Sequence, residues 1–312
     1  MAMSLPVMHL DSQKNRFPIA AGRLLAIGLP ALVGCHAVVL DPQGPVGAAN
    51  RTILVNSLAI MLAIVVPTII ATIGIAWWYR ASNKHARYLP TWAFSGKVEL
   101  VVWSIPLLVI ILLGGVTWIG SHELDPAKPL ESTAEPLEIE VVSLDWKWLF
   151  IYPKERVALV NQLVIPAGVP LHFRLTSASV MNAFFIPRLG SMIYTMNGMA
   201  TELWLHADTP GTFRGLSSHY SGEGFSDMHF EVRAVPADEF ARWVATTRGS
   251  GKALDEAAYS TLVTPSAKVA PAAFGAVDPD LFKKIVTLAL PPGPGPTTEH
   301  QGAKQAPSTE AH

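Results

Sequence analysis

The sequence has a single cysteine and few charged side chains. One cysteine excludes an internal disulfide framework. Charged residues make up 15% of the 312 residues, compared with about 25% in a typical soluble protein, while 50% of the residues are hydrophobic. The formal net charge of −1 provides no basic excess, so nucleic acid is not an expected partner. This composition indicates that part of the chain lies in lipid.

The amino-terminal segment has the pattern of a bacterial secretory signal. Three basic residues, Lys14, Arg16 and Arg23, precede a short apolar run that ends in the box LVGC. This box resembles the signal-peptidase site of lipoproteins, in which the cysteine becomes the lipidated first residue of the mature chain. We therefore predict a lipoprotein signal peptide over residues 1–34 and lipidation at Cys35. The alternative is an ordinary hydrophobic helix that buries its one cysteine.

Two long stretches without charged side chains follow, from Thr52 to Tyr79 and from Leu100 to His122. Each exceeds the roughly 20 residues that a helix needs to cross a bilayer. Tryptophan and tyrosine residues near their ends fit the aromatic belts of membrane helices, which favours two spans over two buried soluble helices. We expect a transmembrane hairpin within residues 35–122, with spans at about 52–79 and 99–121.

The connection between the spans, residues 80–97, sets the orientation. It contains Arg80, Lys84, Arg87 and Lys97 and no acidic residue. By the positive-inside rule, a short loop of this kind faces the cytoplasm. Both ends of the mature chain then lie outside, on the same face as the predicted lipid anchor. We expect a multi-pass protein of the bacterial inner membrane, with its large domain in the periplasm.

Residues 123–236 contain short β-rich runs separated by proline and glycine. The runs are LEIEVVSL, KWLFIY, ALVNQLVI, PLHFRLT, NAFFI, TELWLHA and MHFEVRA. About seven strands at this spacing predict a β-sandwich or barrel. In PLHFRLT the apolar residues alternate with His172 and Arg174, which we expect to face solvent.

The pattern becomes helical over residues 237–290. The runs DEFARWVATTR and PDLFKKIVTLAL predict two amphipathic helices. Residues 291–312 are rich in proline, glycine and polar side chains, which predicts a disordered tail.

Several long stretches in this order resemble subunit II of the haem-copper terminal oxidases. WYRASNKHARY, VVSLDWKWLFIYP, SVMNAFFIPRLGSMIYTMNGM and YSGEGFSDMHF resemble its quinol-oxidising branch, subunit 2 of cytochrome bo-type ubiquinol oxidases. The resemblance extends from about Cys35 to about Leu290 and implies a membrane-anchored α+β fold: a two-helix transmembrane hairpin, a cupredoxin-like β-sandwich and C-terminal helices.

The function implied by this resemblance belongs to a complex. The chain would be subunit 2 of a proton-pumping terminal oxidase that couples ubiquinol oxidation to the reduction of oxygen to water. Its partners would be oxidase subunits 1, 3 and 4 and membrane lipid, with ubiquinol as substrate of the complex. The haems and copper are expected in the catalytic subunit, and no cofactor is expected in this chain.

The loop SSHYSGEGFSDMHFEV occupies the place of a copper loop in related oxidases. In the branch that oxidises cytochrome c, this loop resembles a Cys-Ser-Glu-x-Cys-Gly-x-x-His-x-x-Met run that, with an upstream His, holds a dinuclear copper centre. The corresponding positions here are Tyr220, Gly222, Gly224, Met228 and Glu231 in the loop and Asn182 upstream. Every side-chain ligand is replaced, so the resemblance implies a domain that lacks copper.

The residue types lead to the same expectation without the family. Thiolates hold copper in electron-transfer sites of this kind, and Cys35 is far from the loop in sequence. His219 and His229 could form a weaker site, but their spacing favours exposed surface histidines. We expect Gly222 and Gly224 to permit the turn, with Phe225 and Phe230 packing it down. We therefore expect no residue of this chain to bind a metal ion.

Three aromatic residues and one acid remain as candidates. Trp146, Trp148 and Tyr152 suit an interface with the catalytic subunit, or they fill the sandwich core. Glu99 lies where the second span leaves the cytoplasm. A helix dipole favours an acid at this place, whereas the resemblance implies the mouth of a proton-uptake path.

Two other functions compete with the oxidase subunit. A membrane lipoprotein with a β-sandwich could act alone in binding or assembly, and a free subunit after purification would favour it. A copper electron carrier is the third class, and the missing ligands exclude it.

Overall fold

The structure is a computed structural model that describes residues 38–295. The predicted signal peptide, Cys35 and the tail from residue 296 onward lie outside the described residues. The chain divides after Asp41. A short 3-10 helix, η2 (Val38–Leu40), precedes the division, and all other described elements belong to the unit that begins at Pro42.

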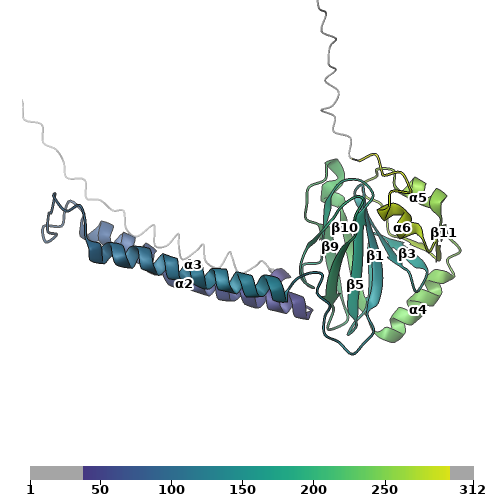
Figure 1. Ribbon diagram of the computed structural model, residues 1–312, viewed down its shortest axis with the longest axis horizontal. Coiled ribbons are helices and arrows are strands. Elements are labelled where there is room, and N and C mark those ends of the chain that lie inside the picture. Colours follow the sequence, from purple (N-terminus) through teal and green to yellow (C-terminus); the bar gives the residue numbers. More distant parts are fainter. Residues whose placement is uncertain (1–37, 296–312) are drawn as a thin grey trace, which may run out of the picture. The chain divides into compact units, whose positions relative to one another are not determined.

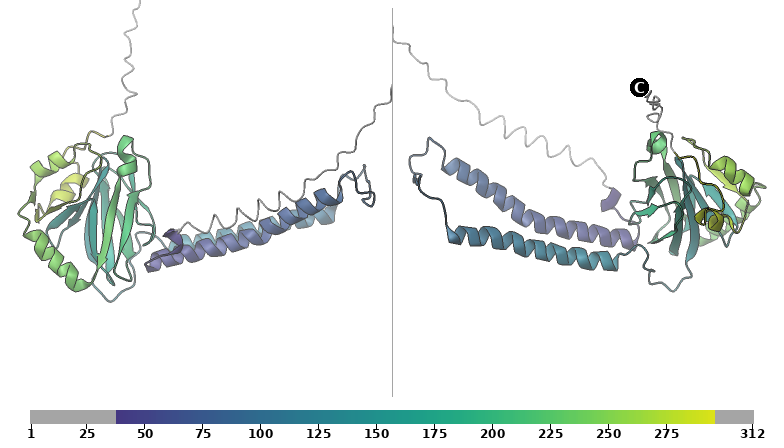
Figure 2. Two further views of the ribbon diagram at one scale, coloured as in Figure 1. Left: turned by 180° about the vertical axis from the view of Figure 1, so that it is seen from behind. Right: turned by 45° about the horizontal axis from the view of Figure 1, so that its top comes forward.

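Two long apolar helices, α2 (Pro45–Trp78) and α3 (Gly96–Glu123), open this unit (Figures 1 and 2). Both are long and apolar enough to cross a membrane, with mean hydropathies of 2.6 and 2.5 in their most apolar windows. Their outward side chains are exposed, so an apolar medium has to cover them. Helix α2 begins at Pro45 rather than near residue 52. Proline suits the first turn of a helix, because a backbone N–H there has no acceptor within the helix and its absence costs nothing.

The following domain contains two β-sheets (Figure 1). In spatial order the larger sheet comprises β12 (Ala272–Phe274), β3 (Val157–Val160), β2 (Lys147–Tyr152), β1 (Leu137–Leu144), β5 (Pro170–Ser177) and β8 (Thr201–His206). The second comprises β4 (Gln162–Pro166), β10 (His229–Val235), β9 (Gly211–Ser217), β6 (Asn182–Phe185) and β7 (Ile193–Thr195). A small pair joins β11 (Ala253–Leu254) to β13 (Ala276–Val277).

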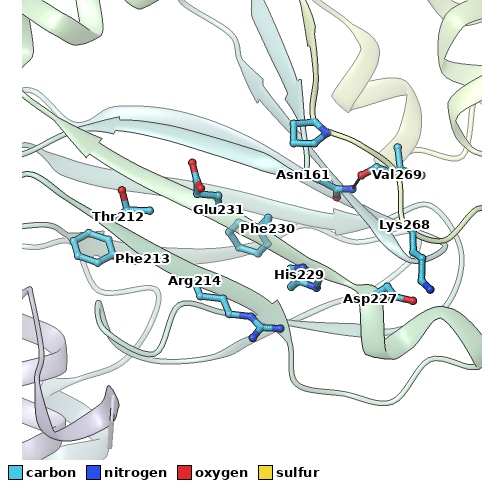
Figure 3. A pocket seen from close by; sticks show the side chains of 11 residues that line it. Asn161, Thr212, Phe213, Arg214, Asp227, His229, Phe230, Glu231, Lys268 and Val269 are labelled. Carbon is cyan, nitrogen blue, oxygen red and sulfur yellow. Dashed lines mark hydrogen bonds between the residues drawn. The ribbon is translucent and has the colours of Figure 1, made fainter. Parts of the chain in front are cut away.

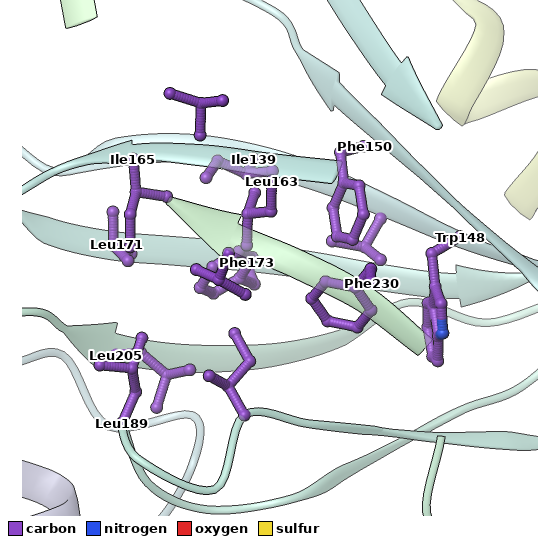
Figure 4. Close-up of a cluster of buried hydrophobic side chains, with 14 of the residues drawn as sticks. Ile139, Trp148, Phe150, Leu163, Ile165, Leu171, Phe173, Leu189, Leu205 and Phe230 are labelled. Carbon is purple, nitrogen blue, oxygen red and sulfur yellow. The ribbon is translucent and has the colours of Figure 1, made fainter. Parts of the chain in front are cut away.

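The main core lies between the two large sheets, as Figure 4 shows for part of it. Strand β5 places Leu171, Phe173 and Leu175 in this core, while Arg174 is exposed and His172 half-buried on the other face. The predicted alternation is confirmed, but the expectation that His172 faces solvent was wrong, because its ring stacks on Trp204 at a centroid distance of 4.4 Å. Rings from both sheets meet in the core, where Trp148 of β2 lies edge-on to Phe184 of β6 at a centroid distance of 5.4 Å.

The run ALVNQLVI is divided between the two sheets at Asn161. We expected one strand here, but β3 ends at Val160 and β4 begins at Gln162. Asn161 has φ 55, a left-handed conformation that asparagine tolerates better than most residues. Its backbone N–H donates to Trp148 O at 2.9 Å, and its side-chain Oδ1 accepts from Trp148 N at 2.9 Å. These bonds fix the corner at which the chain changes sheets.

The C-terminal segment contains strands as well as helices. Helix α4 (Ala237–Arg248) confirms the first predicted helix, and α6 (Leu281–Val286) is a shorter form of the second. Helix α5 (Glu256–Leu262) and strands β11 to β13 were not anticipated. Strand β12 extends the larger sheet beside β3, so the C-terminal extension contains strands in addition to the predicted helices. These short strands lack a run long enough to show a period.

A second core forms between the outer face of the larger sheet and this C-terminal segment. It includes Leu144, Leu149, Tyr259 and Phe282. The buried Lys147 adds a polar attachment, because its Nζ donates to Thr264 O at 2.7 Å. Burial lowers the pKa of Lys147, although Asp145 acts in the opposite direction. The segment is therefore part of the domain rather than an appendage.

Candidate functional site

The loop that corresponds to a copper loop connects β9 to β10 and contains the 3-10 helix η3 (Glu223–Asp227). Gly222 precedes η3 with φ 101, where a side chain would be strained. Ser217 N donates to Met228 O at 3.0 Å and closes the base of the loop. The prediction that Gly222 permits the turn is thus explained by its left-handed backbone conformation.

Polar groups at the base of the loop satisfy one another. Asn182 and Met228 are each 1% exposed, and Ser217 and Ser221 are also buried. The Ser217 hydroxyl donates to Asn182 Oδ1 at 3.3 Å, and the Ser221 hydroxyl donates to Met228 Sδ at 3.9 Å. A neutral hydrogen-bonded cluster therefore occupies the place where a metal would need soft anionic ligands.

Trp146 closes the cluster from the β1–β2 turn. Its indole Nε1 donates to Ser221 O at 3.0 Å. A Cβ on Gly224 would collide with the Trp146 ring, so Gly224 is required for this close approach, whereas its φ, unlike that of Gly222, is not in the left-handed region. Trp146 itself has φ 64, which lies in the left-handed region. The loop is thus fastened to the sandwich by an aromatic ring.

The six positions that correspond to copper ligands differ in exposure, with Gly222 half-buried. Asn182, Gly224 and Met228 are buried, Tyr220 is 72% exposed, and Glu231 faces outward from β10. Glu231 accepts from Gln162 Nε2 at 3.4 Å on that outer face. With amide, thioether, phenol and carboxylate groups in these places, the residues present do not fit a dinuclear copper centre.

The two histidines of the loop lie apart from this cluster. His229 is exposed, as predicted, whereas His219 is half-buried with its ring edge-on to Tyr194 at 5.9 Å. Phe230 is buried in the core, and Phe225 contacts Tyr220 at a ring distance of 5.5 Å. Within residues 38–295, no group of three or more His, Cys, Asp or Glu side chains is placed to hold a metal ion.

A groove of about 630 Å³ lies on the outer face of the second sheet, beside the loop (Figure 3). Side chains of both charge signs line it, including Arg214, Asp227, His229, Glu231 and Lys268. Glu231 and Arg214 are opposite each other in register, yet Glu231 bonds to Gln162. The groove is open to solvent and also lined by apolar side chains such as Phe213 and Val269, and its lining contains no Ser or Cys that could serve as a nucleophile.

Trp148 and Tyr152 are core residues, so the interface prediction was wrong for these two. Both are 0% exposed. The Tyr152 hydroxyl donates to Val164 O at 2.8 Å and accepts from Val164 N at 3.0 Å, and burial strongly raises the pKa of this phenol. Strand β2 is covered on both faces, which alternation alone does not reveal. Trp146 is half-buried, and an interface role for it stays a prediction.

Glu99 lies in the first turn of α3 and is exposed. Its N–H donates to Ser95 O at 3.0 Å, which is an ordinary helix-start contact. This position is compatible with both roles considered for Glu99, an acid favoured by the helix dipole and the mouth of a proton-uptake path. Sequence reasoning missed Ser217 and Ser221, because isolated serines near a turn carry no pattern that marks them as buried.

Known families match two parts of the chain. Residues 137–235 match the periplasmic domain of cytochrome c oxidase subunit II, and residues 248–293 match the COX Aromatic Rich Motif. With two apolar helices before them, these matches define the class: an oxidase subunit II with a cupredoxin-like β-sandwich and C-terminal helices. The predicted fold class is confirmed, and the arrangement fits an inner-membrane protein.

Relatives of nearly full length narrow the class. The chain is 45% identical over 298 residues to cytochrome bo(3) ubiquinol oxidase subunit 2 of Pseudomonas putida, covering 95% of each chain. It is 49% identical over 276 residues to ubiquinol oxidase subunit 2 of Acetobacter aceti, covering 88% of this chain and 90% of that one. The chain belongs to the ubiquinol oxidase subunit 2 family.

Proposed function

We propose that this chain is subunit 2 of a proton-pumping ubiquinol oxidase, in which ubiquinol oxidation is coupled to the reduction of oxygen to water. Membership of the family supports the proposal. The observation that carries the assignment to the quinol-oxidising branch is the buried cluster around Asn182, Ser217, Ser221 and Met228, which replaces the ligands of a copper site. Electrons from a membrane quinol then reach the complex without passing through this domain.

The chain's own contribution is structural support for a catalytic subunit. We assign the haems and copper of the complex to subunit 1, and subunits 3 and 4 complete the assembly. The sandwich retains the scaffold of a copper domain, with Trp146 and Gly224 fastening a loop that has no redox task. Trp146, half-buried at the end of the β1–β2 hairpin, remains the aromatic candidate for contact with subunit 1.

The topology follows from charge. Helices α2 and α3 form a multi-pass hairpin, residues 80–97 lie on the cytoplasmic side, and the sandwich lies in the periplasm of a bacterial inner-membrane protein. In this proposal residues 1–34 are removed and Cys35 is lipidated on the periplasmic side. Glu99, at the cytoplasmic start of α3, collects protons for uptake.

Purification of a tagged chain from its membrane in mild detergent tests the function. We expect haem-bearing partner subunits to co-purify and the preparation to oxidise ubiquinol. Metal analysis should assign no copper to this subunit after it is separated from the others. A stable free subunit without haem or quinol oxidase activity would instead support a lipoprotein that acts alone, and two coppers in this subunit would contradict the assignment to the quinol branch.

Intact-mass measurement of the mature subunit tests the lipid anchor. A diacylated chain that begins at Cys35 is expected. A chain that still begins near Met1, or an unmodified cysteine, contradicts it. Cys35→Ser is expected to leave the hairpin in the membrane, because two apolar helices suffice for insertion.

A further inference from the structure

The two ends of the helical hairpin carry different charge. The connection from Tyr79 to Lys97 contains four Lys or Arg residues and no acid. At the other end, α3 ends with Glu123 and is followed by a segment with Asp125 and Glu131 and a single cation, Lys128. We call residues 79–97 the basic collar. No acidic residue within this segment offsets its positive charge.

Arg80 in the basic collar is held in place by its own helix end. Its Nη1 donates to Trp77 O at 2.9 Å, its Nε donates to Ser82 Oγ at 3.0 Å, and the guanidinium lies 4.6 Å from the centroid of the Trp77 ring. A guanidinium has five N–H donors, so donors remain for an external oxygen. This fixed cation loses little further side-chain entropy when it binds one.

Asn83 orders the turn that follows. Its Nδ2 donates to Trp78 O at 2.6 Å, and its Oδ1 accepts from His85 N at 3.1 Å. Lys84, Arg87 and Lys97 are exposed and make no ion pair within the described part of the chain. The cations of the basic collar are therefore available to an outside anion.

Exposed aromatic side chains accompany these cations: Trp77, Trp78, Tyr79, Tyr88, Trp92 and Phe94. Tryptophan and tyrosine favour the boundary between lipid tails and headgroups. Cations beside such rings are therefore held at the depth of lipid phosphates. Phosphate oxygens accept from several N–H donors at once, which suits both guanidinium and ammonium groups.

We propose that the basic collar is a binding surface for anionic phospholipid headgroups of the cytoplasmic leaflet. The inference rests on the proposed topology, which places residues 79–97 at that leaflet. Charge complementarity and ring placement select an anionic lipid, since a neutral zwitterionic headgroup offers no net attraction to four cations. Each basic side chain near a charged leaflet contributes a separate increment of attraction, so several together produce selectivity.

The test uses the purified oxidase complex, exchanged into a mixture of phosphatidylglycerol and phosphatidylethanolamine. Native mass spectrometry measures which lipid this subunit retains. We expect wild type to retain phosphatidylglycerol preferentially, and Lys84→Gln/Arg87→Gln/Lys97→Gln to lower that preference about tenfold or more. Arg51→Gln/Lys128→Gln, which removes two cations from the opposite end, is the matched control and should change it little.

Other outcomes overturn the inference without touching the proposed function. Equal lipid retention by wild type and the triple variant, in a complex that keeps its haem and quinol oxidase activity, means that the basic collar does not select anionic lipid. Loss of a partner subunit from the triple variant, with lipid retention unchanged, means that an acidic protein surface occupies it instead. Failure of wild type to co-purify with haem subunits would contradict the proposed function itself.

Discussion

The indole ring of Trp146 lies directly against the backbone of Gly224, at a distance that leaves no room for a Cβ. The same indole donates to Ser221 O at 3.0 Å. One side chain from the β1–β2 hairpin therefore fixes two points of the β9–β10 loop. In a copper domain the metal would join the parts of this loop, whereas here the packing of one ring and a hydrogen bond do so.

Gly224→Ala is expected to destabilise the domain by about 1–3 kcal/mol, because the new methyl group forces the Trp146 ring to move. Thermal unfolding measures the loss, and the near-ultraviolet circular dichroism of the indole should change. Ser226→Ala is the control, since Ser226 is exposed in the same loop. Equal stability of both variants would show that the ring adapts without cost.

Glu140 is predicted to make stability depend on pH. Burial raises the pKa of Glu140 to about 7, with Arg174 lowering it and Glu138 raising it further. Its side chain is 13% exposed and lies 3.2 Å from Arg174 Nη1. Since the folded pKa exceeds the unfolded value of 4.5, the folded state binds the proton more tightly. Stability from this group is complete below about pH 4.5 and is lost as pH rises through 7.

Glu140→Gln should remove this pH dependence. At about pH 8 we expect the variant to be more stable than wild type by about 1–3 kcal/mol, and near pH 5 the difference should shrink. Urea unfolding of the detergent-solubilised chain at several pH values measures it. Glu131→Gln, at an exposed position before β1, should leave the pH profile as in wild type. A wild-type profile that stays flat between these values contradicts the prediction.

Gly44 is predicted to be essential at the start of α2. A Cβ here would collide with the carbonyl oxygen of His206, a backbone atom that cannot turn away as a side chain can. Neighbouring bonds, from Asp208 N to Gln43 O at 2.9 Å and from Gly47 N to Leu189 O at 3.0 Å, hold the two segments together. Gly44→Ala should therefore expose this junction to protease and lower the melting temperature.

Gly74→Ala is the control for this prediction. It lies inside α2, where a Cβ would meet nothing within 4 Å, and alanine favours a helix over glycine. Gly44→Ala should then lower the melting temperature, whereas Gly74→Ala should raise it. Similar melting temperatures for both would mean that the backbone at Gly44 shifts freely.

The sequence predicted those elements whose pattern is long or periodic. The two apolar helices, the alternation in β5 and the replaced ligands at Asn182 and Met228 could all be identified from residue types. The sheet change at Asn161 could not, because a left-handed residue inside an apolar run has no period. Trp148 and Tyr152 face the main core between the sheets. The burial of Leu149 and Ile151, on the other face of β2, depends on a second core formed with residues more than a hundred positions later, which no local pattern reports.

At the candidate site too, some features could be predicted from the sequence and others required the fold. Loss of the thiolates was visible in the sequence, whereas the way the loop holds together without metal was not. It depends on Trp146 meeting Gly224 and Ser221, a contact made only when two distant hairpins pack. Chemistry that depends on residue type could thus be predicted, and chemistry that depends on contact required the fold.

Glu99 combines an ordinary helix-start geometry with a proposed role in proton uptake. It is exposed in the first turn of α3, where the helix dipole favours an acid by roughly 0.3–1 kcal/mol. If that were its only role, replacement would alter stability slightly and turnover not at all. A proton-uptake role makes a different demand, because a carboxylate exchanges protons with water and an amide or methyl group does not.

We therefore predict that Glu99→Ala and Glu99→Gln lower quinol oxidase turnover about tenfold while haem content and subunit composition stay unchanged. Glu99→Asp should be milder, since it keeps the acid and only shortens its reach. Turnover across roughly pH 6 to 9 measures the effect, and the loss should deepen as protons become scarce at high pH. Glu123→Gln, at the opposite end of the same helix, is the matched control. Wild-type turnover in a fully assembled Glu99→Ala complex would leave Glu99 with the helix-start role alone.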